Sequence, residues 1–181
     1  IGKESTQVGD WNIVEPLSSI DNVARQGING PIYALLALDT FDYETSNAEI
    51  RQECVSFILE KQLADGGWAL FGTAGDPDIT SMALQALANY QDQDTVKAAV
   101  ESGIECLSGM QKEDGGYASW GTVNAESCAQ AIIACTTLGI DPNTDPRFVK
   151  DGNSLVDALL NFYIENENAF SHVAGGGKNG M

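Results

Sequence analysis

The stretch FILEKQLADGGWALFGTAGDPDITSMALQAL, residues Phe57–Leu87, has the pattern of a helix, a glycine turn and a second helix. A second stretch, CLSGMQKEDGGYASWGTVNAESCAQAIIAC over Cys106–Cys135, follows the same order. The two turns superpose at an offset of 49 residues, from Trp68 to Tyr117. Similarity at a fixed period is typical of repeat architectures. The sequence therefore predicts repeated helix pairs.

Two less complete copies flank this pair. Gly27–Leu38 superposes on the second helix of the first stretch, and Ser154–Met181 supplies a first helix with the aromatic Phe170 in the turn after it. The last copy stops where its second helix should begin. The predicted repeats cover approximately residues 17–40, 50–90, 97–139 and 152–181, the last being incomplete.

The two helices of each pair have different patterns. Arg51–Leu63 and Lys97–Met110 are amphipathic at helical spacing, as expected for outer helices with one solvated face. The second helices, SMALQALANY and SCAQAIIACTTLG, are apolar nearly all round, which is typical of helices buried on both sides. Alternating outer and inner helices predict an all-α fold, either a double-layered barrel or an open solenoid of helix pairs.

Local signals mark the start of each inner helix. Asp76 is expected to cap the first one, with Pro77 at its first position and Asp78 in its first turn. Asn124 and Glu126 repeat this arrangement. The Asp-Gly-Gly sequence before each inner helix ends the outer helix, because glycine adopts positive φ and allows close backbone approach.

Composition excludes several classes of partner. The 181 residues include 43% hydrophobic residues, enough for a sizeable core. Twenty-six acidic against nine basic residues give a formal charge of −17, which repels nucleic acid and anionic lipid surfaces. No apolar run approaches the roughly 20 residues of a membrane span, and the given sequence does not begin with the charged start and apolar stretch that are typical of a signal peptide. The four cysteines fall inside helical patterns and are expected to be buried thiols.

The segments QLADGGW, starting at Gln62, and QKEDGGY, starting at Gln111, resemble the glutamine-to-tryptophan repeats of the terpenoid cyclase and protein prenyltransferase superfamily. The resemblance covers roughly Pro31–Met181 and implies an α/α toroid, with the N-termini of the inner helices around one mouth of a central cavity. This architecture serves several functions. The chain is also similar to toroid modules of secreted or surface proteins of Gram-positive bacteria, which implies a secreted or cell-surface location.

Class II terpene cyclases protonate an alkene with the middle aspartate of a DxDD motif. The resemblance places the acid at Asp78 and the first aspartate at Asp76, but Ile79 replaces the third. Such an acid must stay protonated, which requires burial and a neighbouring carboxylate. The N-terminus of a helix favours the charged form instead. Helix capping also explains both residues without catalysis.

Other chemistries of the superfamily are less complete in this sequence. Glu126, Cys128 and His172 imitate the zinc ligands of protein prenyltransferases, but the family acid is aspartate, and we expect a buried thiol and a loop histidine instead. No thioester motif is present. The loop Asp141–Asp145 begins like a calcium site but has Pro146 where glycine is required. We therefore expect neither a metal nor a cofactor.

A toroid that stops in mid-repeat exposes apolar surface. We therefore expect either a longer chain, of on the order of 300 residues for about six pairs, or a second copy that closes the ring. The leading hypothesis is a non-catalytic module that binds a small molecule or peptide at the mouth of the cavity. The alternatives are a cyclase that uses Asp78 as its acid and a structural spacer. The residues expected at the mouth are Asn29, Asp78, Glu126 and Asn179.

Overall fold

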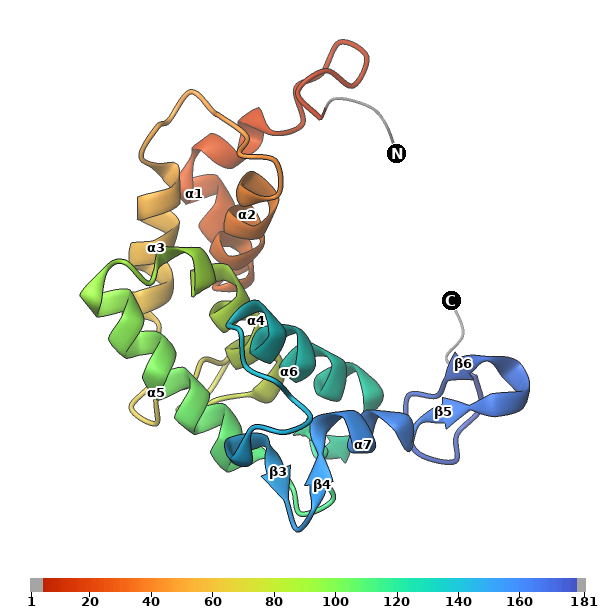
Figure 1. Ribbon diagram of the computed structural model, residues 1–181. Coiled ribbons are helices and arrows are strands. Elements are labelled where there is room, and N and C mark those ends of the chain that lie inside the picture. The colour runs from red at the N-terminus through yellow and green to blue at the C-terminus, as the bar shows by residue number, and fades with distance from the viewer. Residues whose placement is uncertain (1–4, 179–181) are drawn as a thin grey trace. The chain divides into compact units, whose positions relative to one another are not determined.

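The computed structural model describes residues 5–178 and is rich in helix (Figure 1). Within these residues, α-helices and short 3-10 turns are accompanied by three two-stranded antiparallel hairpins. The chain divides into two compact units, one ending at Gln62 and the other starting at Leu63. A single domain over residues 1–181 therefore stays a prediction, and each unit is described by itself.

The first unit contains one pair of packed helices. It begins with η1 (Glu15–Ser18), α1 (Ile20–Val23) and η2 (Ala24–Gln26), followed by α2 (Asn29–Asp39) and α3 (Ile50–Glu60). Helix α2 packs against α3, and apolar residues of both helices form the core. The least exposed of these are Ile32, Leu35, Leu38, Ile50, Val55 and Ile58.

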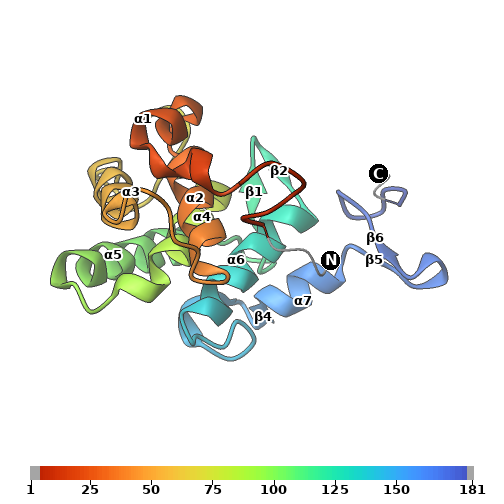
Figure 2. The ribbon, with the colours of Figure 1, turned by 90° about the horizontal axis from the view of Figure 1, so that it is seen from above.

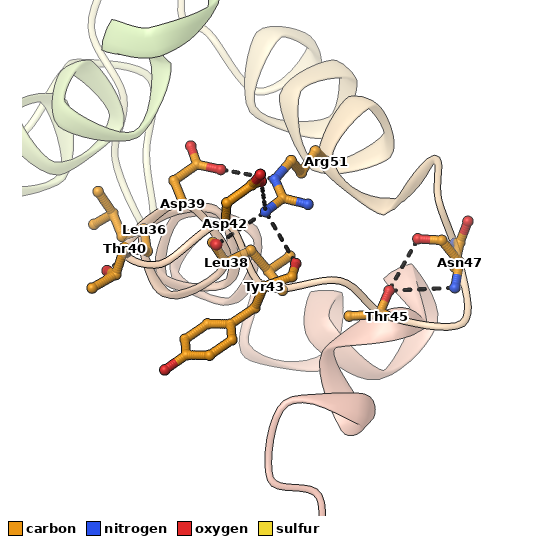
Figure 3. A network of polar contacts seen from close by, with 9 residues as sticks. All are labelled: Leu36, Leu38, Asp39, Thr40, Asp42, Tyr43, Thr45, Asn47 and Arg51. Carbon is orange, nitrogen blue, oxygen red and sulfur yellow. Dashed lines mark hydrogen bonds and ion pairs between the residues drawn. The ribbon is translucent and has the colours of Figure 1, made fainter. Parts of the chain in front are cut away.

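Arg51 fastens the loop between α2 and α3 (Figure 3). Its Nε donates to Asp39 Oδ1 at 2.9 Å. Its Nη2 donates to the carbonyl oxygens of Leu38 and Tyr43, both at 3.0 Å, and to Asp42 Oδ1 at 3.1 Å. A cation at the C-terminus of α2 satisfies carbonyl groups that have no partner within the helix. One side chain of α3 therefore fixes the course of the preceding loop.

In the second unit, one buried helix packs against two others (Figures 1 and 2). Helix α4 (Pro77–Leu87) contacts both α5 (Asp94–Met110) and α6 (Ala125–Thr137), and η3 (Ala88–Tyr90) follows α4. Nearly all residues of α4 are buried. Helix α5 buries a single stripe, which consists of Val96, Ala99, Val100, Gly103, Ile104 and Leu107. The predicted inner and outer characters of these two helices are confirmed.

The two Asp-Gly-Gly turns have the same backbone structure. The second glycine of each turn, Gly67 or Gly116, donates its N–H to the aspartate before it at 3.0 Å and 2.9 Å. In both turns the same glycine accepts a 2.9 Å hydrogen bond through its carbonyl oxygen. The first glycine, Gly66 or Gly115, has φ of +85° or +81°. The repeat inferred from sequence is therefore also a repeat of main-chain geometry.

The aromatic residue that follows each turn is fully buried. Trp68 and Tyr117 both have 0% exposure. The backbone N–H of Trp68 donates to Thr80 Oγ1 at 2.9 Å, and the Tyr117 hydroxyl donates to the Leu107 carbonyl oxygen at 2.7 Å. The backbone of Trp68 and the hydroxyl of Tyr117 therefore tie each turn to an adjacent helix.

Three features of the second unit differ from the prediction. Helix α6 is exposed along one side, where Ile133 is 46% exposed, because among the described elements only α4 and α7 (Leu155–Leu160) pack on it extensively. Helix α7 is short and has only six residues. Phe170 does not repeat the role of Trp68, since it is 38% exposed and contacts the ring of Tyr163 in a hairpin.

The segment before α7, which corresponds by repeat position to the first half of α5, forms a hairpin instead of a helix. A Cβ added to Gly66 would lie 2.6 Å from the carbonyl oxygen of Ser102, in the middle of α5, and one added to Gly115 would lie 2.5 Å from that of Ser154. Ser154 therefore takes the place of Ser102, yet it is the N-cap of α7. The preceding residues form η4 (Pro146–Phe148) and the β3–β4 hairpin of Val149–Lys150 and Asn153–Ser154.

The chain continues beyond α7 into a further hairpin (Figure 1). Its strands, β5 (Tyr163–Ile164) and β6 (Ala169–Phe170), enclose η5 (Glu165–Glu167). Cys54, Cys128 and Cys135 are buried free thiols as expected, and Cys106 is half-buried. None of the described helices combines the length and the apolar character of a membrane span.

Candidate functional site

An open cavity of about 620 Å³ lies in the second unit at the N-terminus of α4. Its walls come from residues 69–75, from the C-terminal end of α5, and from the hairpin of β1 (Ala118–Ser119) and β2 (Thr122–Val123). Figure 2 shows this hairpin immediately before α6. A cavity of this size is within the usual range for small-molecule sites. Met82 and Ile79 of α4 give it an apolar inner surface.

Two exposed aromatic side chains line the cavity. Phe71 is 81% exposed and Trp120 is 86% exposed. They are related by the repeat, because each lies three residues after the buried aromatic of its turn and is followed by Gly-Thr. The two repeats thus contribute equivalent side chains to one cavity. Large exposed apolar groups that gather at a cavity are a mark of binding surfaces.

The conformation of the β1–β2 hairpin presents Trp120 at its tip. Trp120 has φ of +53° and Gly121 has φ of +83°, and Ser119 pairs with Thr122 on either side of them. A two-residue turn with positive φ at both central positions is favoured in hairpins, but a bulky side chain there is uncommon. Such an outlier supports a hypothesis of function.

Asp76 performs the capping role that was predicted. Its Oδ1 accepts from the backbone N–H groups of Asp78 and Ile79 at 3.0 Å and 3.1 Å. Its Oδ2 accepts from the Ser119 hydroxyl at 2.9 Å, so this carboxylate also joins the hairpin to α4. Asn124 caps α6 in the same way, accepting from the N–H of Ser127 at 2.8 Å. Both oxygens of Asp76 therefore have partners within the chain.

Asp78 lies beside Asp76 in the same cavity and is half-buried. Its Oδ1 is buried and has no hydrogen-bond partner among the described residues. Burial raises the pKa of the Asp78 carboxyl above its ordinary value, and the charges of Asp76 and Glu126 add to that rise. The hydroxyls of Ser127 and Ser119 act in the opposite direction. Burial thus raises the pKa of Asp78, whereas the N-terminus of the helix lowers it by favouring the charged form.

This shift predicts a pH-dependent effect of Asp78→Asn on stability. The folded chain holds the Asp78 proton more tightly than the unfolded chain, so ionisation of this group costs stability as the pH rises above its ordinary pKa of 3.8. We expect Asp78→Asn to gain stability relative to the wild type as the pH rises above about 4, until the carboxyl of the folded wild type is fully ionised. Urea unfolding at a series of pH values measures this difference.

Asp94→Asn is the matched control for this change. Asp94 is the exposed first residue of α5, so its replacement alters the net charge equally but removes no buried carboxylate. We expect no such gain from this variant. A difference between Asp78→Asn and the wild type that stayed flat or fell as the pH rose would contradict the prediction.

The structure brings together only part of the predicted mouth. Asp78 and Glu126 occupy equivalent positions in the first turns of α4 and α6, and the charge of Glu126 acts on Asp78. Glu126 is half-exposed and forms a 2.7 Å ion pair with His172 Nδ1. Asn29 belongs to the first unit, where it lines a different hollow of about 370 Å³. Asn179 lies outside the described residues.

The two residues that sequence reasoning missed are Phe71 and Trp120. The signal was nevertheless present, because the tripeptides Phe-Gly-Thr at Phe71 and Trp-Gly-Thr at Trp120 recur at the same offset as the turns. Their exposure was not readable from sequence, since the preceding aromatics of the same motif are buried.

Within residues 5–178, no group of three histidine, cysteine or acidic side chains is arranged to hold a metal ion. Asp141 instead forms a local turn, accepting from the Asn143 N–H at 2.9 Å and from the Thr144 hydroxyl at 2.8 Å.

No family model matches the chain, and comparisons with curated proteins and with solved structures found no significant match either. The functional argument therefore depends on the geometry of the cavity.

Proposed function

We propose that this chain is a non-catalytic binding module of an α/α toroid, and that the cavity at the N-terminus of α4 accepts a small molecule or a segment of peptide. The observation that carries the proposal is the pair of repeat-related exposed aromatics, Phe71 and Trp120, at a cavity with a carboxylate on its inner side. An apolar cavity with a few converging polar groups is the usual form of a ligand site.

The surroundings of the cavity support a binding role over a purely structural one. Asp76 joins the hairpin to α4 through Ser119, so the position of Trp120 is fixed by contacts with the helix layer. A spacer would have no need to hold a bulky side chain exposed at positive φ. Binding sites whose walls are already ordered lose less entropy when the ligand enters.

Three further elements of the proposal concern the whole protein. Helices α4 and α6 pack against each other, which supports the proposal that they are successive inner helices. The exposed side of α6 would then be the surface against which the next inner helix packs. The remainder of a longer chain, or a second copy, would supply that helix. The secreted or cell-surface location follows from the sequence resemblance and belongs to the same proposal.

A fragment screen monitored by ¹H–¹⁵N NMR tests the binding role. We expect members of a library of small cationic, neutral and anionic molecules to shift the amides of the hairpin and of residues 69–75. Trp120→Ala should weaken those hits by about 10-fold or more, because an aromatic anchor supplies a large part of such contacts. Trp11→Ala, which removes an exposed tryptophan of the first unit that does not line this cavity, should leave them unchanged.

Other outcomes would replace the proposal. If no library member shifted the amides around the cavity, a structural spacer would account for the chain better. The raised pKa of Asp78 favours the protonated form that a cyclase acid needs, so a cyclase is the second candidate. Release of a cyclic product from a polyprenyl substrate, lost in Asp78→Asn, would establish that activity instead.

A further inference from the structure

Among residues 5–178, no recorded ion pair neutralises the two aspartates of the cavity at α4. Asp76 and Asp78 both line it, and Glu126 lies near enough for its charge to act on Asp78. Within the described residues, the recorded ion pairs join Arg51 to Asp39 and Asp42, Arg147 to Asp145, and His172 to Glu126. None of them involves Asp76 or Asp78. Lys112, at the opposite wall, is exposed and forms no ion pair with either aspartate. The cavity therefore carries excess negative charge.

Asp78 is the carboxylate left for a ligand. Asp76 already accepts three hydrogen bonds, two from backbone N–H groups and one from Ser119. Asp78 Oδ1, by contrast, is buried and accepts no hydrogen bond of normal geometry within the described residues, although the hydroxyls of Ser127 and Ser119 lower the pKa of this carboxyl. A buried carboxylate oxygen that lacks a hydrogen-bond donor destabilises the folded state. A charged donor stabilises such an oxygen more than a neutral donor does.

The aromatic residues add a second requirement. Phe71 and Trp120 leave most of their side-chain surface exposed at the same cavity. The face of an aromatic ring attracts cations, with tryptophan the strongest, and the ring also packs against apolar groups. A ligand that satisfies both the rings and the carboxylate must combine a positive charge with an apolar body.

From this combination we infer that the cavity binds a protonated amine carried on an apolar or aromatic body, with the ammonium group donating to Asp78 and the body lying against Phe71 and Trp120. This inference rests on the proposed function and specifies its ligand class. The amine can belong to a free small molecule or to a lysine side chain of a peptide, since both present the same ammonium group. The overall charge of −17 further favours cationic ligands at long range.

The test compares three probes that share one aromatic body. Isothermal titration calorimetry at low ionic strength would be run with 2-phenylethylammonium, neutral 2-phenylethanol and anionic phenylacetate. We expect the ammonium probe to bind at least about 10-fold more tightly than the alcohol, and phenylacetate to bind weakest. A blocked peptide containing Lys-Phe is the fourth probe, and its affinity relative to the free amine identifies which source of ammonium the cavity prefers.

Two variants make the result specific to the site. Asp78→Asn should reduce the preference for ammonium over alcohol to less than about 3-fold while the alcohol still binds. Asp94→Asn, with the same change in net charge at an exposed position, should retain the preference. Circular dichroism of each variant verifies that it is folded.

The possible failures are distinguishable. If the alcohol or phenylacetate bound as tightly as the ammonium probe and shifted the same amides, the charge inference would be overturned while the binding module remained. Equal loss of preference in Asp94→Asn would also overturn it, because the effect would then come from net charge alone. If no probe and no library member bound at the cavity, both the inference and the proposed function would fail.

Discussion

Trp68→Ala should lower the free energy of unfolding by about 3–5 kcal/mol, the usual cost of removing a large aromatic side chain from a core. Trp68 is fully buried, and its indole lies so close to α5 that a Cβ added to Gly103 would be 2.8 Å from Trp68 Cζ3. Truncation would leave a cavity between the turn and the helix. Chemical denaturation followed by far-UV circular dichroism measures the loss.

Two other variants make the Trp68 prediction specific. Trp120→Ala removes the same type of side chain from a position that is 86% exposed, and we expect its effect to stay within about 0.5 kcal/mol. Trp68→Tyr introduces the residue that the second repeat uses at this position, and it should retain the fold if the alanine variant does not. Equal losses for Trp68→Ala and Trp120→Ala would contradict the assignment of one ring to the core and the other to the site.

The second large effect is expected for Gly115→Ala, with a loss of about 3 kcal/mol or more. Gly115 has φ of +81°, and an added Cβ would lie 2.5 Å from the carbonyl oxygen of Ser154. The substitution therefore combines an unfavourable backbone conformation with a clash against main chain, which cannot move aside as a flexible side chain can. Equilibrium unfolding in urea provides the measurement.

Gly121→Ala separates these two causes. Gly121 has nearly the same φ, +83°, but an added Cβ would meet nothing within 4 Å. Gly121→Ala should lower the free energy of unfolding by only about 1 kcal/mol, the cost of the unfavourable backbone conformation alone. The difference between the two variants then measures how much stability depends on the close approach of the turn to the segment that begins α7. A similar cost for both would mean that this approach relaxes easily.

Sequence reasoning predicted those parts of the fold where local signals and repeat spacing agree. The inner helix α4, its cap at Asp76 and the two Asp-Gly-Gly turns were all readable, because each depends on residues adjacent in the chain. The hairpin that precedes α7 was not predicted. Phe148 is fully buried there, but the chain around it forms a 3-10 turn and a hairpin.

The hairpin that precedes α7 carries its own signal. Asp151 and Gly152 have φ of +48° and +84° and form the two-residue turn between β3 and β4. An Asp-Gly pair between short extended segments is a strong hairpin signal. The predicted repeats, at approximately residues 97–139 and 152–181, assigned no element to this segment. Periodic similarity thus predicts the positions of successive elements better than it predicts their type.

Of the candidate site, only the two aspartates could be predicted from the sequence. Asp76 and Asp78 could be located from the helix start, but the balance between burial and the helix N-terminus at Asp78 depends on surrounding side chains from α6 and the hairpin. The exposure of Trp120 likewise depends on the hairpin turn and not on its sequence neighbours. Tertiary surroundings therefore decided the properties that matter most for binding.

The loops between each buried aromatic and the next helix cap differ in length, but the same backbone hydrogen bond joins the two ends of each loop. Seven residues separate Trp68 from Asp76 and six separate Tyr117 from Asn124, yet in each case the N–H of the cap donates to the carbonyl oxygen of the aromatic. Fixed ends allow the intervening residues to vary without disturbing the helices. Natural selection or a protein engineer could thus alter ligand preference by exchanging these short segments alone, much as antibody loops diversify on a constant framework.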